Sequence, residues 1–145
     1  MTRRRRTKGQ ALVEFALVFP LLAIILFGII DLGRGIYMYN GVSQAAREIA
    51  RSASVHPGSP LGSSPETTAV IDVQRKLVPG IRAGSLGITF HCEGLDGTTV
   101  PGDGAGGCAA PDVVRVVVTA QYSPVALLGF GGPLTLSSSS SNQVQ

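Results

Sequence analysis

The sequence has few of the residues from which catalytic and metal sites are built. It contains two cysteines, two histidines and only 14% charged residues among 145 positions. It has no phosphate-binding Walker loop, no HExxH zinc motif, no GxSxG nucleophile motif and no second cysteine pair. His56 precedes a proline in a turn-rich loop, and His91 falls on the outward face of a predicted strand. We therefore expect no catalytic residue, no metal ion and no cofactor, and the chain is not predicted to be an enzyme.

Charge is scarcest between Ala11 and Ile30, where Glu14 is the single charged residue. A helix rises 1.5 Å per residue, so about 20 mostly apolar residues cross a hydrocarbon core about 30 Å thick. A buried helix of a soluble domain would show a polar stripe, and none is visible in this stretch. The sequence therefore predicts a membrane-spanning helix over residues 10–31, in contact with the lipid bilayer.

The basic residues are concentrated before this helix. Residues 1–9 form a short leader with five of the twelve basic residues of the chain: Arg3, Arg4, Arg5, Arg6 and Lys8. Such a run also occurs in nucleic-acid-binding arms, but directly before a spanning helix it is typical of a cytoplasmic flank. The remaining seven basic and nine acidic residues form no basic excess, so no nucleic-acid partner is predicted. We expect a cytoplasmic N-terminus and an exported C-terminal part.

Glu14 is the anomaly within the apolar stretch. A carboxylate near one end of a spanning helix costs a few kcal/mol unless it reaches the interface or has a partner. In one interpretation, Glu14 lies solvated at the depth of the lipid headgroups. In the other, it is kept for a partner that becomes available through assembly or processing.

The apolar pattern changes after the spanning helix. Residues 32–55 are predicted to continue the same rod as an amphipathic helix, which ends before Pro57 and Gly58. One face of this helix carries apolar side chains at steps of three and four: Val42, Ala45, Ala46, Ile49 and Ala53. Asp31 and Arg34 are interpreted as residues of the outer membrane interface.

Residues 56–138 are expected to form an exported domain. A short helix begins after Ser64, with Pro65 in its first position, and stops at Pro79–Gly80. Alternation of apolar and polar residues predicts strands over Leu86–Cys92 and Val113–Tyr122. Leu134–Ser138 is a candidate third strand, the short apolar stretch 125–130 is ambiguous, and residues 139–145 are expected to be a flexible polar tail. The predicted fold class is α+β, with a small antiparallel sheet covering the apolar face of the long helix.

Cys92 and Cys108 both fall on the predicted exported side, where disulfides persist. Cys92 ends one predicted strand, and Cys108 lies shortly before the next. If the two strands pair as a hairpin, the sulfur atoms come close together at one end of the ladder. We predict a disulfide, and two free, partly buried thiols are the alternative.

In these features the chain resembles the TadE-like family, minor pseudopilin-like proteins of bacterial Tad (Flp-type) pilus systems. The resemblance is carried by GQALVEFALVFPLLAIILFGIIDLGR, and less specifically by VVRVVVTAQYSP and LTLSSSSS. Type IV-like prepilins have a short basic leader that ends in glycine and a glutamate at the fifth position after the cut. Gly9 and Glu14 match these positions, and Phe15 completes the Glu-aromatic pair of the Tad branch. Gln10 stands where many type IV pilins have Phe or Met.

The resemblance implies a structural or assembly-priming role in a Tad-type pilus assembly or secretion system. It implies cleavage between Gly9 and Gln10 by a prepilin peptidase, and Glu14 as a carboxylate used in assembly. The implied partners are other pilin or pseudopilin subunits and the inner-membrane Tad platform. The implied location is the bacterial cell membrane, as a single-pass protein, or the pilus itself. The alternative is a single-pass, membrane-anchored exported binding or structural domain unrelated to pili.

Overall fold

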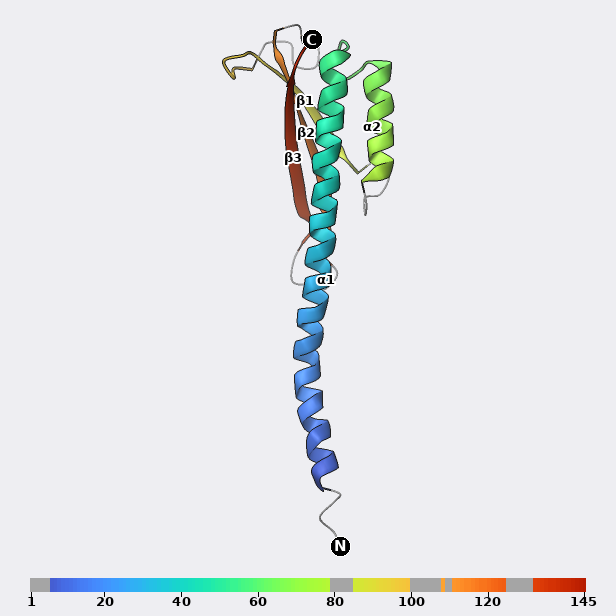
Figure 1. Ribbon diagram of the computed structural model, residues 1–145, viewed down its shortest axis with the longest axis vertical. Helices are drawn as coiled ribbons and strands as arrows, with labels where there is room; N and C mark the ends of the chain where they lie inside the picture. The colour runs from blue at the N-terminus through green and yellow to red at the C-terminus, as the bar shows by residue number, and fades with distance from the viewer. Residues whose placement is uncertain (1–5, 79–84, 100–107, 109–110, 125–131) are drawn as a thin grey trace.

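The computed structural model describes residues 6–78, 85–99, 108, 111–124 and 132–145. Two helices, α1 (Arg6–Val55) and α2 (Pro65–Leu77), precede three strands, β1 (Gly87–Glu93), β2 (Val113–Tyr122) and β3 (Leu134–Gln143). In Figure 1, α1 is a long rod whose C-terminal part is flanked by α2 on one side and the sheet on the other. The N-terminal part of the rod extends away from this domain. The arrangement confirms the predicted α+β fold class.

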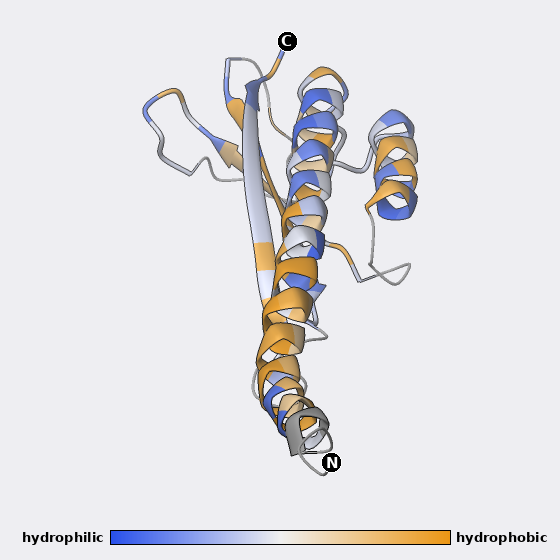
Figure 2. Ribbon diagram, turned by 60° about the horizontal axis from the view of Figure 1, so that its bottom comes forward, coloured by the Kyte–Doolittle hydropathy of each residue, from blue (hydrophilic) through white to orange (hydrophobic). Residues whose placement is uncertain are grey.

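Helix α1 has 50 residues and is therefore about 75 Å long. Pro20 lies inside it, where the ring removes one backbone donor, and the helix continues on both sides. Figure 2 shows two halves of different character, an N-terminal half that is mostly hydrophobic and a C-terminal half where polar and apolar residues alternate. The single rod predicted over residues 10–31 and 32–55 is thus present.

Helix α2 begins where its capping residues predict. The Ser64 side chain accepts a hydrogen bond of 3.2 Å from the backbone N–H of Thr67, and Pro65 occupies the first turn. Glu66 in the first turn and Arg75 and Lys76 in the last turn complement the helix dipole. The predicted stop at Pro79–Gly80 lies outside the described residues.

The sheet is antiparallel throughout, in the order β1-β2-β3. The central strand β2 alternates as its sequence predicts, because five residues of one face are buried: Val114, Val116, Val118, Ala120 and Tyr122. Cys92 of β1 pairs with Val114, and Ser138 of β3 pairs with Val118. The buried face therefore continues from β1 across β2 to β3.

Small side chains let α1 approach this face closely. Ala45, Ala46, Ala50 and Ala53 are fully buried in the core, beside Val42 and Ile49 of the same helix. On β3, the residues in register with the buried valines of β2 include Ser138 and Ser140, which are half-buried. Because alanine and serine side chains are small, the helix and the sheet can pack closely. The sheet therefore covers the apolar face of α1, as expected.

The structure departs from the sequence prediction at the C-terminus. Strand β3 runs to Gln143, whereas a strand ending at Ser138 and a flexible tail over residues 139–145 were expected. The five residues 139–143 pair with Val113–Val117 of β2, and the N–H of Val144 donates to the carbonyl of Asp112 at 2.9 Å. A serine run has no apolar period, so only its tertiary partner makes it a strand. The ambiguous stretch 125–130 lies outside the described residues.

Candidate functional site

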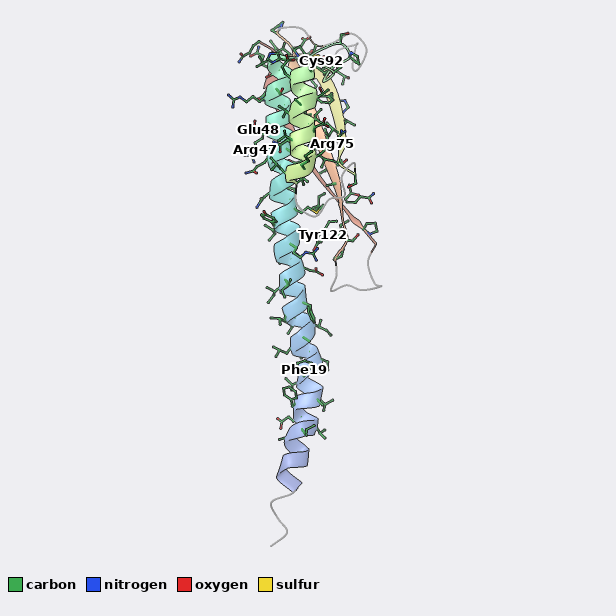
Figure 3. The ribbon with its side chains drawn as sticks, turned by 90° about the vertical axis from the view of Figure 1, so that its right-hand side faces the viewer. Phe19, Arg47, Glu48, Arg75, Cys92 and Tyr122 are labelled. Carbon is green, nitrogen blue, oxygen red and sulfur yellow. A yellow bond between two sulfur atoms is a disulfide. The ribbon has the colours of Figure 1, made fainter. Side chains whose placement is uncertain are left out.

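The largest exposed apolar surface of the described residues lies along the N-terminal half of α1. No part of its most apolar 18 residues is buried against the rest of the chain. Phe15, Phe19 and Phe27 each have more than half of their surface exposed, and Figure 3 shows Phe19 on the part of the rod that has no neighbouring element. This surface cannot be satisfied by water. The helix fits a single-pass membrane anchor by length and composition.

The predicted processing residues lie at the free end of this helix. Gly9, Gln10, Glu14 and Phe15 are all exposed and all helical. A side chain added at Gly9 would meet no atom within 4 Å. Gln10 and Glu14 are four residues apart, so they share one face of α1 at a rise of about 6 Å. The structure thus brings the predicted cleavage position and the predicted assembly carboxylate to adjacent turns, and their roles stay predictions.

A second constellation joins the anchor helix to the C-terminal domain. The hydroxyl of Tyr122 at the end of β2 donates to the main-chain carbonyl of Asp31 at 2.8 Å and lies 3.4 Å from its carboxylate Oδ1. Arg34 lies one turn further along α1, with Nη1 3.8 Å from the same Oδ1. Asp31 is buried, and the ring of Tyr122 packs beside Gly35. The three groups fix the lower end of the sheet against α1, where Figure 3 places Tyr122.

Sequence reasoning assigned Asp31 and Arg34 to the membrane interface and missed their connection to Tyr122. The two partners of the hydrogen bond are 91 residues apart. The only sequence signals were an acid directly after an apolar run and a tyrosine at the end of an alternating strand. Neither pattern predicts contact with the other, so this link required the fold.

The pKa of the Tyr122 phenol is raised above its usual value. Burial opposes the phenolate most, and the neighbouring Asp31 carboxylate repels it as well. Tyr122 therefore contributes stability that is fully present below about pH 10, the ordinary pKa of tyrosine in an unfolded chain. That contribution is lost as the pH rises through the raised pKa of the folded state.

We expect Tyr122→Phe to lower the free energy of unfolding by about 1–2 kcal/mol, because the buried carbonyl and carboxylate of Asp31 lose a donor. The variant should also lose less stability than the parent chain above pH 10. Denaturant unfolding in detergent, followed by circular dichroism at several pH values, measures both effects. Tyr39→Phe is the matched control, since Tyr39 is 47% exposed. Equal stability of Tyr122→Phe and the parent chain would show that the hydroxyl contributes nothing.

The opposite end of the domain is closed by the predicted disulfide. Cys92 and Cys108 are bonded, with Cα atoms 5.7 Å apart, which confirms the pairing and excludes the alternative of two free thiols. Figure 3 places Cys92 at the end of the domain far from Phe19. Asp112 is close to both sulfur atoms. These are the described residues that come nearest to a metal-ligand cluster, but the bonded sulfurs offer no thiolate.

The two histidines belong neither to the predicted processing residues nor to the Tyr122–Asp31–Arg34 cluster. His56 is exposed after the end of α1, and its carbonyl accepts hydrogen bonds from the hydroxyls of Ser64 and Thr67. His91 lies on β1 in register with Arg115, whose guanidinium pairs with Glu93 at 3.1 Å. The exposure of His56 agrees with its interpretation as a surface residue, whereas His91 is half-buried.

Comparison with known proteins supports the resemblance found in the sequence. Residues 9–51 match the model of the TadE-like protein family. The match begins at the predicted cleavage position, covers most of α1 and ends before α2. No curated protein and no solved structure matches the chain.

Proposed function

We propose, from the match of residues 9–51 to the TadE-like family, that this chain is a membrane-anchored, pseudopilin-like component of a Tad-type pilus assembly or secretion system. Its role is structural or assembly-priming, and not enzymatic. The observation that carries the proposal is that the matched residues form a helix whose apolar half is wholly exposed and begins with the Gly9–Glu14 spacing. A surface of this kind serves both a bilayer and a bundle of like helices.

Processing after Gly9 fits the physics of this helix. Cleavage would remove the five basic residues that hold the leader in the cytoplasm and would create a free amine at Gln10. Gly9 lies inside the first turns of α1, and glycine lowers helix stability by about 1 kcal/mol relative to alanine. A helix weakened there unwinds more easily, which gives a prepilin peptidase access to the Gly9–Gln10 bond.

Glu14 gives the new amine a partner. An unpaired ammonium at the edge of the hydrocarbon region is costly, and a carboxylate offsets that cost. In our proposal, the Glu14 carboxylate of a neighbouring subunit neutralises the Gln10 amine within a bundle of anchor helices. Residues 10–31 then form the membrane segment, and residues 32–55 carry the domain of residues 56–138 on the exported side.

The proposed orientation makes a topological prediction. Alkaline phosphatase fused after Gln145 should be active, because this enzyme needs disulfides that form only outside the cytoplasm. The Gln145 side chain is exposed at the end of the domain far from α1's N-terminus, so the fused enzyme extends away from the membrane segment (Figure 1). A green fluorescent protein fused before Met1 should fluoresce in the same cells. An inactive phosphatase at Gln145, with the fusion intact by immunoblot, would reverse the orientation.

The function itself is tested by deleting the gene in the bacterium that carries it and restoring it from a plasmid. We expect the deletion to abolish or sharply reduce surface pili and the restored strain to recover them, as measured by shearing and immunoblot of the major pilin. The membrane level of the major pilin serves as the control for expression. Wild-type pilus output from the deletion strain would leave the alternative, an exported domain on a plain anchor.

A further inference from the structure

An apolar groove lies at the foot of the sheet, where the C-terminal domain meets the anchor helix. Its volume is about 600 Å³, and its walls come from α1, from the end of β2 and from the start of β3. Leu32 and Ile36 of α1 line one side, and Leu134 and Leu136 of β3 line the other. Leu32, Ile36 and Leu134 each have more than half of their surface exposed. Among the described residues, a hydrophobic surface is thus open at the end of the domain nearest the span.

The exposed apolar surface of the chain is longer than a bilayer core. Large apolar side chains are exposed along α1 from Leu12 to Tyr39, a rise of about 40 Å. The hydrocarbon core is about 30 Å thick, and about 40–45 Å with both headgroup layers. If the helix enters the hydrocarbon near Ala11, it leaves it near Ile30. The groove residues Leu32 and Ile36 then lie at the depth of the adjacent headgroup layer.

Asp31 does not interrupt this surface. Its side chain is buried, and the Tyr122 hydroxyl and the Arg34 guanidinium lie within 4 Å of its carboxylate. The apolar strip along α1 therefore passes Asp31 without an exposed carboxylate. Ile24 and Gly28 belong to the same groove as Leu32 and Ile36, so the groove is continuous with the face of the span that meets lipid.

The polar groups at the rim are those that proteins place at a membrane surface. Tyr39 of α1 lines the groove and is 47% exposed, whereas Tyr122 is buried with its hydroxyl bonded to Asp31. Tyrosine is enriched at the headgroup level, where its ring meets acyl chains and its hydroxyl meets water. The Arg34 side chain is 55% exposed and pairs with Asp31, which lines the groove, and a guanidinium pairs readily with a lipid phosphate.

From this continuity we propose that the groove is a phospholipid-binding site at the bilayer surface. The headgroup ends of acyl chains in the adjacent leaflet enter the space between α1 and the start of β3, and Arg34 contacts the phosphate of such a lipid. The foot of the domain thereby rests on the membrane as a second contact besides the span, and this contact fixes the tilt of the domain against α1. The inference rests on the proposed role of α1 as a membrane anchor and adds a partner for the domain itself.

The absence of tryptophan allows a direct test on the full chain in liposomes. Leu134→Trp places a single tryptophan at the groove, Phe19→Trp places one in the span, and Leu77→Trp places one on α2, where Leu77 is 65% exposed. The fluorescence of each variant is measured with phospholipids brominated either near the top or near the end of the acyl chain. Circular dichroism of each variant confirms that the fold is kept.

We expect Phe19→Trp to be quenched strongly and Leu77→Trp to be unaffected. Leu134→Trp should be quenched roughly twofold or more, and more by bromine near the headgroup than by bromine near the chain end, as residues at the interface are. If Leu134→Trp shows no more quenching than Leu77→Trp while Phe19→Trp is quenched, the proposed lipid site is wrong and the membrane anchor stands. Unquenched Phe19→Trp would contradict the anchor itself. If quenching of Leu134→Trp appears only when protein is diluted in lipid, a second copy of the chain fills the groove, and the proposal is wrong.

Discussion

Replacing Cys92 and Cys108 together by alanine should lower the free energy of unfolding of the C-terminal domain by about 3 kcal/mol. The two residues are 16 positions apart, and cross-linking a loop of this size removes about that much chain entropy from the unfolded state. The loss is large for a small domain, whose total stability is about 5–15 kcal/mol. Both side chains are buried, so alanine is preferred to serine, which would bury a hydroxyl.

Urea unfolding of the full chain in detergent, followed by circular dichroism, measures this loss. The loss should be confined to the domain, so amide hydrogen exchange in β1 and β2 should accelerate while the N-terminal half of α1 stays unchanged. Leu95→Ala is the matched control, because Leu95 lies in the connection between the two cysteines and is 70% exposed. An unchanged urea midpoint for the double variant, relative to Leu95→Ala, would show that the hairpin is held by its ladder and side-chain packing alone.

Replacing Glu14 by alanine should reduce surface pili at least about tenfold without blocking removal of the leader. An unpaired charge at the membrane edge costs a few kcal/mol, and about 1.4 kcal/mol is already a tenfold change in an assembly equilibrium. Glu14→Gln keeps the shape of the side chain and removes its charge, so it should assemble as poorly as Glu14→Ala. Val18→Ala, one turn further along the exposed face of α1, should assemble normally.

The measurement compares two quantities in each strain: sheared pili, and the mass of the membrane-bound chain. Gly9→Leu separates the two steps, since it should retain the leader and fail before assembly. A Glu14→Gln strain with full pilus output would show that the carboxylate is a solvated interfacial group, which is the other interpretation left open by the sequence.

Several elements could be predicted because their signals are local. The single charge between Ala11 and Ile30 predicts the apolar half of α1, and the alternation in Val113–Tyr122 predicts β2 together with its buried face. Ser64 followed by Pro65 marks the start of α2. The disulfide could be predicted as well, because the two cysteines flank adjacent strands of one hairpin.

The remaining features depend on contacts across the chain. Residues 139–143 form a strand only because β2 offers them a ladder, and their serine-rich sequence has the composition of a tail. The hydrogen bond between Tyr122 and Asp31 has no local sequence signal. The apolar groove also depends on this contact between α1 and the end of β2, so it could not be predicted either. Gly9, Gln10 and Glu14 act on other molecules in our proposal, so the fold of one chain leaves their roles as predictions.

The mature N-terminus tests the central claim most directly. Intact mass spectrometry of the chain purified from the membranes of its own host distinguishes a processed pseudopilin from a plain anchor. Our account predicts a chain that begins at Gln10 in the wild type and at the original N-terminus in Gly9→Leu. A wild-type chain that still begins at Met1 or Thr2, in cells whose other prepilins are processed, would contradict it.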